Sequence, residues 1–259
     1  MRRRRKAARK REQIEKFKRL RADANMPLGR GFYFIPTREQ FGALAPETVT
    51  KLIYLNTFNN VGDNILMRTL KTPMLKGDLP DVLKLSRSTM YRFWNEVSPL
   101  YISENAEKVL ISNRDVFKRG KLRKKETESY MKFWIKGTRA LYEAADIKYH
   151  DKLGYLFKLL PYINIEWNIL CYPEYVFETE LDRIELLPLE EFCRLSGFDY
   201  THVNTLKEYY REITFPVNGR DEMFCAITEN TNSICINPHV LYSGSSFDKV
   251  EGFAALCRK

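Results

Sequence analysis

The chain has 259 residues, a net charge of +10 and an aromatic content of 13%. This length suffices for two domains with cores of their own, and the aromatic content argues against global disorder. No run of 18 apolar residues is present, so we expect no membrane span, and no apolar run follows the basic N-terminus, so we expect no secretory signal.

Charge is distributed very unevenly along the chain. Residues 1–21 contain 12 Lys and Arg and two acids, so the remainder of the chain is neutral overall. Residues 68–125 are again basic, with 14 bases and six acids, whereas residues 172–259 hold eight bases and 15 acids. Clustered bases favour a polyanionic partner such as nucleic acid. We therefore expect nucleic-acid contacts in the first half of the chain rather than the second.

Three short phrases occur twice in the same order, and their separation grows from 104 to 124 residues. They are Asn-apolar-x-x-Asn-Ile-Leu at 60–66 and 164–170, Leu-Ser at the end of an apolar segment at 85–86 and 195–196, and Asn-x-x-Val-apolar-x-x-Gly at 113–120 and 237–244. Loop insertions in a duplicated unit would produce this growth, so we predict a tandem repeat. The asparagines of the first phrase look structural, because Asn after a helix readily takes a left-handed conformation.

In the first copy, apolar spacing and capping residues predict a helix, a strand, two helices and a β-hairpin. Asp78 and Ser86 are positioned as N-caps of the second and third helices. This order is that of a winged helix-turn-helix, in which the hairpin is the wing. The predicted helices are 45–58, 78–85 and 87–97, the strand is 64–67, and the hairpin strands are 100–103 and 108–112.

The second copy follows the same order, with a wing over residues 215–236. Its predicted helices are 154–162, 189–195 and 200–213, the last capped by Asp199, and its strand is 168–171. Between the copies we predict a helix over 126–145, whose apolar stripe needs a partner, either a repeat domain or a second subunit. The stripe consists of Met131, Trp134, Ile135, Thr138, Leu141 and Tyr142.

These patterns predict a mainly α fold with small β-wings (α+β), built from two tandem winged helix-turn-helix domains joined by a helix. The predicted parts are a basic N-terminal arm at 1–27, a DNA-reading domain at 28–120, a basic linker and connecting helix at 121–150, and a second domain at 151–259.

The third helix of the first copy carries residue types that read DNA bases. Its apolar face is Met90, Phe93 and Val97, and polar side chains occupy the opposite face. Arg pairs with guanine and Asn with adenine, whereas Ser, Thr and Tyr suit phosphate contacts. An ordinary solvated helix face is the alternative interpretation. The predicted DNA-binding residues of this helix are Arg87, Ser88, Thr89, Tyr91, Arg92 and Asn95.

Two basic runs are predicted to contact DNA phosphates, and the alternatives are a nonspecific electrostatic tail and a solvated linker. The N-terminal run is Arg2, Arg3, Arg4, Arg5 and Lys6, and the run after the first wing is Lys118, Arg119, Lys121, Arg123, Lys124 and Lys125.

The second copy is predicted to serve mainly in dimerisation or partner binding. Glu190 and Glu191 precede its third helix, where they would repel phosphates. The alternative is a weaker DNA contact through His202, Asn204 and Lys207.

No catalytic, metal or cofactor site is predicted. The five cysteines and three histidines have no metal-ligand spacing, and we expect the cysteines to be buried small apolar residues. No phosphate-binding loop, kinase or nucleophile-elbow pattern is present, so we expect no enzyme activity.

Residues 85–92 and 110–120, together with the Ile-Asn-Pro phrase at 236–244, resemble winged-helix proteins of plasmids and phages of Gram-positive bacteria. These are RepL-like plasmid replication proteins and MarR-like phage regulators. The resemblance implies a sequence-specific double-stranded DNA-binding protein that acts in transcription regulation or DNA replication. It also implies a protein that is cytoplasmic and nucleoid-associated in a bacterial host.

Expected partners are DNA, a replication or transcription protein, and a second copy bound through domain 2 or the 126–145 helix. The alternative function is a protein-interaction or structural factor that binds nucleic acid only nonspecifically.

Overall fold

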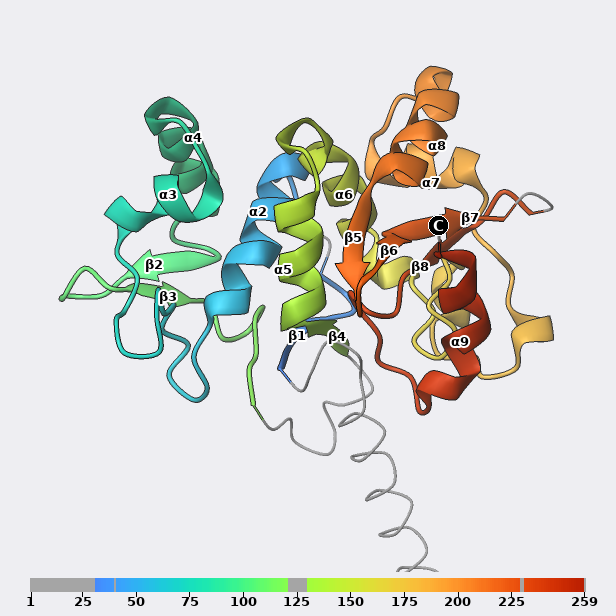
Figure 1. Ribbon diagram of the computed structural model, residues 1–259, viewed down its shortest axis with the longest axis horizontal. Helices are drawn as coiled ribbons and strands as arrows, with labels where there is room; N and C mark the ends of the chain where they lie inside the picture. The colour runs from blue at the N-terminus through green and yellow to red at the C-terminus, as the bar shows by residue number, and fades with distance from the viewer. Residues whose placement is uncertain (1–30, 40, 121–129, 229–230, 259) are drawn as a thin grey trace, which may run out of the picture.

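The computed structural model describes residues 31–39, 41–120, 130–228 and 231–258. This part of the chain is a mixed α+β fold of short helices and two-stranded antiparallel sheets (Figure 1). The helices are α2 (Pro46–Leu55), α3 (Leu79–Leu83), α4 (Arg87–Val97), α5 (Ile135–Ala144), α6 (His150–Phe157), α7 (Leu189–Ser196), α8 (Val203–Glu212) and α9 (Phe247–Leu256). The strands are β1 (Phe32–Pro36), β2 (Ile102–Glu104), β3 (Leu110–Ser112), β4 (Tyr130–Trp134), β5 (Thr214–Val217), β6 (Arg220–Met223), β7 (Cys225–Ile227) and β8 (Ile234–Ile236).

Helix α4 forms where the sequence predicts it, for local reasons. The Ser86 hydroxyl accepts a hydrogen bond from the Thr89 amide at 3.2 Å and so caps the helix. Met90, Trp94 and Val97 are buried on one face of the helix, at the spacing that brings side chains to the same side. The predicted N-cap and the predicted apolar face are both confirmed.

The predicted capping role of Asp78 is wrong. Its carboxylate accepts from the Leu75 amide at 2.8 Å and pairs with Arg68, so it closes the turn before α3 rather than capping the helix. Pro80 stands in the first turn of α3, where a missing N–H removes no helical hydrogen bond. Lys84 ends the helix in a left-handed conformation, with φ of 54°.

The helix predicted over residues 126–145 is wrong in its first part, because Tyr130–Trp134 is strand β4. Burial alternates along the start of this strand, as the two faces of a strand require, and its aromatic residues suit a sheet. Strand β4 pairs antiparallel with β1, so that Phe32 lies opposite Trp134. The rings of Tyr33 and Phe133 stack across the pair with their centres 5.5 Å apart.

The apolar face of helix α5 packs against other parts of the chain. Its Leu141 and Tyr142 are buried, and the Tyr142 ring stacks on Tyr54 of α2 with a centre-to-centre distance of 3.8 Å. The Tyr142 hydroxyl donates to the Leu83 carbonyl at 3.1 Å. Of the two partners expected for the apolar stripe, the structure shows the one within the chain.

The described chain consists of two units that meet at the β1–β4 pair. Phe34 of β1 bridges Lys118, which follows the β2–β3 hairpin, and Phe133 of β4 bridges Leu241, which follows the β7–β8 hairpin. We call residues 31–120 the first unit and residues 130–258 the second unit. One continuous apolar core runs through both units, and a smaller cluster around Ile169 and Cys235 lies in the second.

The same long-range hydrogen bonds occur at matched positions of the two units. Asn64 has φ of 60°, and its amide donates to the carbonyls of Phe117 at 2.7 Å and Ser112 at 3.4 Å. Asn168 has φ of 58°, and its amide donates to the carbonyls of Leu241 and Ile236, each at 2.9 Å. The acceptors stand 124 residues apart, the offset of the third repeated phrase, so these contacts support the predicted duplication.

The segment predicted as the second wing, residues 215–236, forms two antiparallel hairpins, β5–β6 and β7–β8. Ile169 bridges Cys235 of β8 just as Ile65 bridges Ile111 of β3, so β7–β8 is the counterpart of β2–β3. The β5–β6 hairpin, with its turn at Asn218 and Gly219 in left-handed conformations, is an addition that the second unit carries beside α5 (Figure 1).

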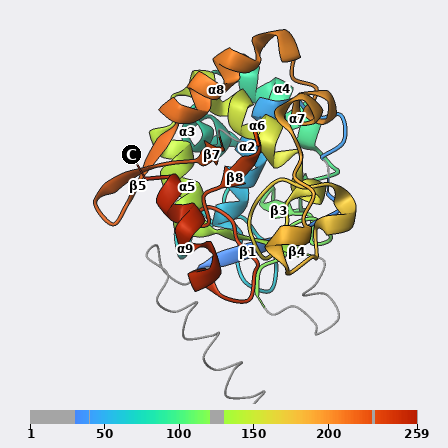
Figure 2. The ribbon, with the colours of Figure 1, turned by 90° about the vertical axis from the view of Figure 1, so that its right-hand side faces the viewer.

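Helices α2, α5 and α6 occupy the middle of the molecule, with β1 and β4 at one end of them (Figure 1). Helices α4 and α8 lie at the opposite end, on either side of the middle, and both views place them there (Figures 1 and 2). None of the helices within the described ranges is long and apolar enough to cross a membrane.

Candidate nucleic-acid interface

Helix α4 presents one exposed polar face to solvent. Arg87, Ser88, Tyr91, Arg92 and Asn95 are exposed, while Thr89 is half-buried beside Ser86. Within the described part of the chain, the side chains of Arg87, Arg92 and Asn95 form no hydrogen bond or ion pair. Their side chains are therefore uncommitted, as groups that bind an external ligand must be. The structure thus brings the six predicted residues of this helix together on one surface.

Positive charge beside α4 comes partly from the chain that precedes it. The Lys76 ammonium lies 4.3 Å from the centre of the Trp94 ring, which holds it against the helix by a cation–π contact. Arg68 pairs with Asp78 and lies 3.8 Å from Asp81, so its charge is compensated locally. Lys76, Arg87 and Arg92 thus carry positive charge that no acid among the described residues pairs with.

The β2–β3 hairpin contributes little positive charge. The Asn105 side chain accepts from the amides of Glu107 at 3.0 Å and Val109 at 2.9 Å, which fixes the turn. The exposed charged side chains at the tip are Glu104, Glu107 and Lys108. Any contact of this tip with a phosphate backbone would therefore depend on Lys108, because the two acids oppose it.

The basic run after this hairpin is only partly described, and one of its members faces inward. The Arg119 guanidinium donates to the Asn59 carbonyl, and burial, together with neighbouring Arg139, lowers its pKa. Lys118 is hydrogen-bonded to Phe34 through its backbone, and its ammonium lies 5.8 Å from the Tyr130 ring centre. Arg119 is thus held by the protein itself. Lys121, Arg123, Lys124, Lys125 and the N-terminal run Arg2, Arg3, Arg4, Arg5 and Lys6 lie outside the described residues.

Helix α8, the counterpart of α4, has an outer face of mixed charge. His202, Asn204, Glu208 and Arg211 are exposed, and the Lys207 ammonium donates to the Asn232 side chain at 3.1 Å. Two nearby acids are already engaged by the chain. Glu191 of α7 accepts from Arg194 at 2.7 Å, and Glu212 accepts from the Tyr149 hydroxyl. This face therefore repels a polyanion less than its count of acids suggests.

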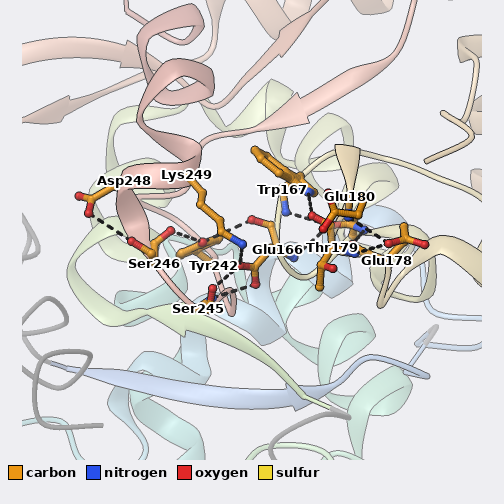
Figure 3. A network of polar contacts seen from close by, with 11 residues as sticks. Glu166, Trp167, Glu178, Thr179, Glu180, Tyr242, Ser245, Ser246, Asp248 and Lys249 are labelled. Carbon is orange, nitrogen blue, oxygen red and sulfur yellow. Dashed lines mark hydrogen bonds and ion pairs between the residues drawn. The ribbon is translucent and has the colours of Figure 1, made fainter. Parts of the chain in front are cut away.

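A polar network in the second unit is structural. The Glu166 carboxylate accepts from the Lys249 ammonium at 2.5 Å, from the Ser245 amide at 2.9 Å and from the Ser245 hydroxyl (Figure 3). Burial opposes ionisation of this carboxyl, but these hydrogen bonds outweigh it and lower the pKa of Glu166. All three contacts join α9 and the loop before it to the Asn164–Asn168 segment. The network ties the C-terminal helix to the core.

A second buried pair also serves the fold. Glu222 accepts from Asn237 at 2.8 Å and lies 2.8 Å from Nδ1 of His239. Burial opposes ionisation, yet these two partners lower the pKa of Glu222. Across the residues with a described position, no three His, Cys, Asp or Glu are placed to hold a metal ion.

All five cysteines are buried, as predicted, and none forms a disulfide. Burial raises the pKa of Cys193 to about 11 and that of Cys257 to about 12. These thiols therefore stay protonated near neutral pH, and a protonated thiol is a poor nucleophile.

No family model, no curated protein and no solved structure matches the chain.

Proposed function

We propose that this chain is a non-enzymatic duplex-DNA-binding protein whose first unit is a winged helix-turn-helix that reads base sequence through α4. The order of α2, the extended residues 65–67, α3, α4 and the β2–β3 hairpin supports this assignment. Ile65 bridges Ile111 of β3, as the first strand of a winged helix pairs with the wing. The second unit repeats this order with α6, α7, α8 and β7–β8, so we propose the same motif there.

The uncommitted polar face of α4 carries the proposal. A recognition helix needs a buried face that anchors it and an exposed face whose donors are free to meet base edges. In α4 the buried face is Met90, Trp94 and Val97, and the exposed face offers Arg92 and Asn95. A bidentate arginine–guanine contact contributes about 1–3 kcal/mol of discrimination between bases.

The biological setting is proposed from the resemblance of residues 85–92, 110–120 and 236–244 to plasmid and phage proteins. In that setting the protein acts in the bacterial cytoplasm, at the nucleoid, as a transcriptional regulator or a replication initiator. The N-terminal arm and the basic residues at 121–125 would add phosphate contacts that strengthen binding to any sequence and make affinity strongly dependent on salt.

Selection from a random duplex library at about 150 mM salt tests this function. We expect an enriched motif, and we expect the double variant Arg87→Ala/Arg92→Ala to bind it about 2–6 kcal/mol more weakly, at roughly 1–3 kcal/mol for each arginine. The matched control is Arg183→Ala/Arg220→Ala, which removes the same charge from exposed positions of the second unit. Unchanged specific affinity in the α4 variant would contradict the proposal.

A second candidate function is a protein-interaction module that touches nucleic acid only nonspecifically. Two large exposed apolar side chains favour it, since Leu70 is fully exposed and Leu100 is 69% exposed, both in the first unit. The same selection separates the two functions, because this candidate predicts no enriched motif and binding that collapses as salt rises.

A further inference from the structure

The helices α2 and α6 meet in a reciprocal contact. By the 104-residue offset of the first repeated phrase, Pro46 corresponds to His150 and Thr50 corresponds to Gly154. The Thr50 hydroxyl donates to the His150 carbonyl at 2.6 Å, and a Cβ on Gly154 would lie 1.8 Å from the Pro46 carbonyl oxygen. Each unit therefore touches the other with the same two positions. Such reciprocity is the mark of a two-fold relation.

The β1–β4 pair shows the same reciprocity independently. The strands run antiparallel, with Phe34 opposite Lys132 at the centre. On its other edge each strand bridges the segment after its own unit's hairpin, at Lys118 for β1 and at Leu241 for β4. Equivalent parts of the two units thus meet twice in antiparallel fashion. An approximate two-fold axis passes between β1 and β4 and between α2 and α6.

This axis relates α4 to α8. Both helices lie at the same end of the molecule, on opposite sides of α2 and α6 (Figures 1 and 2). Dimeric helix-turn-helix proteins use such a pair of helices to contact two half-sites on one face of a duplex. In this protein a single chain supplies both helices.

The two helices differ in the side chains that they present. Adding 116 to the residue numbers of α4 aligns it with the corresponding segment of the second unit. The buried Met90, Trp94 and Val97 then match the buried Leu206, Tyr210 and Ile213. At the matched positions of the outer face, the second unit has Glu208 where α4 has Arg92, and Asn204 where α4 has Ser88. Arginine pairs with guanine, whereas glutamate accepts a hydrogen bond from the cytosine amino group and asparagine pairs with adenine. The two helices would therefore select different base pairs.

The charges around α8 allow a contact that is weaker than that of α4. The charge of Glu191 is compensated by Arg194, whereas Glu212 accepts a hydrogen bond from the neutral Tyr149 hydroxyl and keeps its charge. Arg211 is exposed and corresponds to Asn95, which adds a cation on the outer face. Glu208 still reduces the attraction for phosphates that drives general DNA affinity. We expect α8 to contribute more to selectivity than to affinity.

We propose that one chain binds a duplex that carries two unlike half-sites in inverted orientation, with α4 on the stronger half-site and α8 on the weaker. This inference rests on the proposed function and adds a specificity role for the second unit. The half-site centres are separated by about 10 base pairs or a multiple of that distance, because both helices approach from the same side of the duplex.

The experiment repeats the library selection with the full chain and with the double variant Asn204→Ala/Glu208→Ala. Both residues are exposed, so the variant should retain its fold, and Glu251→Ala on the exposed surface of α9 removes one carboxylate elsewhere as a control. We expect the α8 variant to lose base preference in one part of the motif only, with about a 10- to 100-fold fall in the ratio of specific to nonspecific affinity. The α4 variant should lose the other part. The mass of the complex should correspond to one chain on each duplex.

Two results would overturn this inference and leave the proposed function standing. One is an enriched motif that the α8 variant recognises unchanged, and the other is a symmetric inverted repeat that binds two chains. Absence of any enriched motif with the wild-type chain would instead overturn the proposed function itself, so the two failures are distinguishable.

Discussion

The two units keep the same interior contacts and present different surfaces. Asn113 and Asn237 both accept a hydrogen bond from the amide two residues further on, each at 2.9 Å, and Asn64 and Asn168 make the matched contacts described above. On the outer face of the third helix, Arg92 stands where the second unit has Glu208. The units therefore share a way of folding and differ in what they can bind.

Burial explains this contrast. A buried amide that loses its partners costs about 1–3 kcal/mol for each unsatisfied group, whereas most exposed substitutions change stability by less than about 0.5 kcal/mol. Asn64 and Asn168 are buried, so few residues can replace them, while Arg92 and Glu208 are free to differ. Recognition can thus diverge between units without disturbing the fold.

The largest effect is expected from removing the matched asparagines. Asn64→Ala and Asn168→Ala should each lower the free energy of unfolding by about 3–4 kcal/mol, because the buried carbonyls lose their donor and alanine disfavours the left-handed backbone. Chemical denaturation measures both. Asn168→Gly is the control that restores backbone freedom and should cost about 1 kcal/mol less. If the free energy of unfolding fell by less than about 1 kcal/mol at only one of the two positions, the two asparagines would not be equivalent.

A smaller loss is expected where the two units touch. Gly154→Ala should lower the free energy of unfolding by about 3 kcal/mol, because its Cβ would collide with backbone atoms of Pro46 at the α2–α6 crossing. Gly252→Ala on α9 is the matched control, since nothing lies within 4 Å of its Cβ, and it should stabilise the protein by about 0.5–1 kcal/mol. Equal thermal stability of the two variants would mean that the crossing is not closely packed.

The smallest of these effects depends on pH and also concerns the crossing. Burial lowers the pKa of His150 from 6.5 to about 4. The unfolded chain therefore binds more protons between these values, and stability falls as pH is lowered from 6.5 towards 4. Denaturation at pH 7 and pH 5 should differ by about 2 kcal/mol through this residue. In His150→Gln that part of the difference should disappear, and an unchanged pH dependence would mean that His150 is already charged in the folded protein.

Local signals predicted the elements of the first unit well. Ser86 caps α4 and the Asn105 turn closes the β2–β3 hairpin, and both are decided by residues close in sequence. Strands β1 and β4 could not be found in this way, because each is stabilised by a partner about 100 residues away. The same is true of α5, whose apolar stripe was recognised although its partner, α2, was not. Asn64 and Asn168 have the left-handed backbone expected of them, but the distant carbonyls they bind leave no local pattern.

The candidate site was predictable from helix periodicity and less so from charge. The spacing of Met90, Phe93 and Val97 fixed which side chains of α4 would be exposed. A run of bases does not reveal which guanidinium turns inward, and Arg119 binds the Asn59 carbonyl sixty residues away. The match between Arg92 and Glu208 also required the structure, because the offset between the units changes from 110 residues at Ser86 and Ser196 to 116 residues at α4 and α8.

The most direct test of the central claim is the ratio of two affinities. The wild-type chain should bind the enriched duplex at least about 10³-fold more tightly than a scrambled duplex of equal length at about 150 mM salt, as sequence-reading proteins do. A ratio near one, with both affinities falling together as salt rises, would contradict the claim that α4 reads bases.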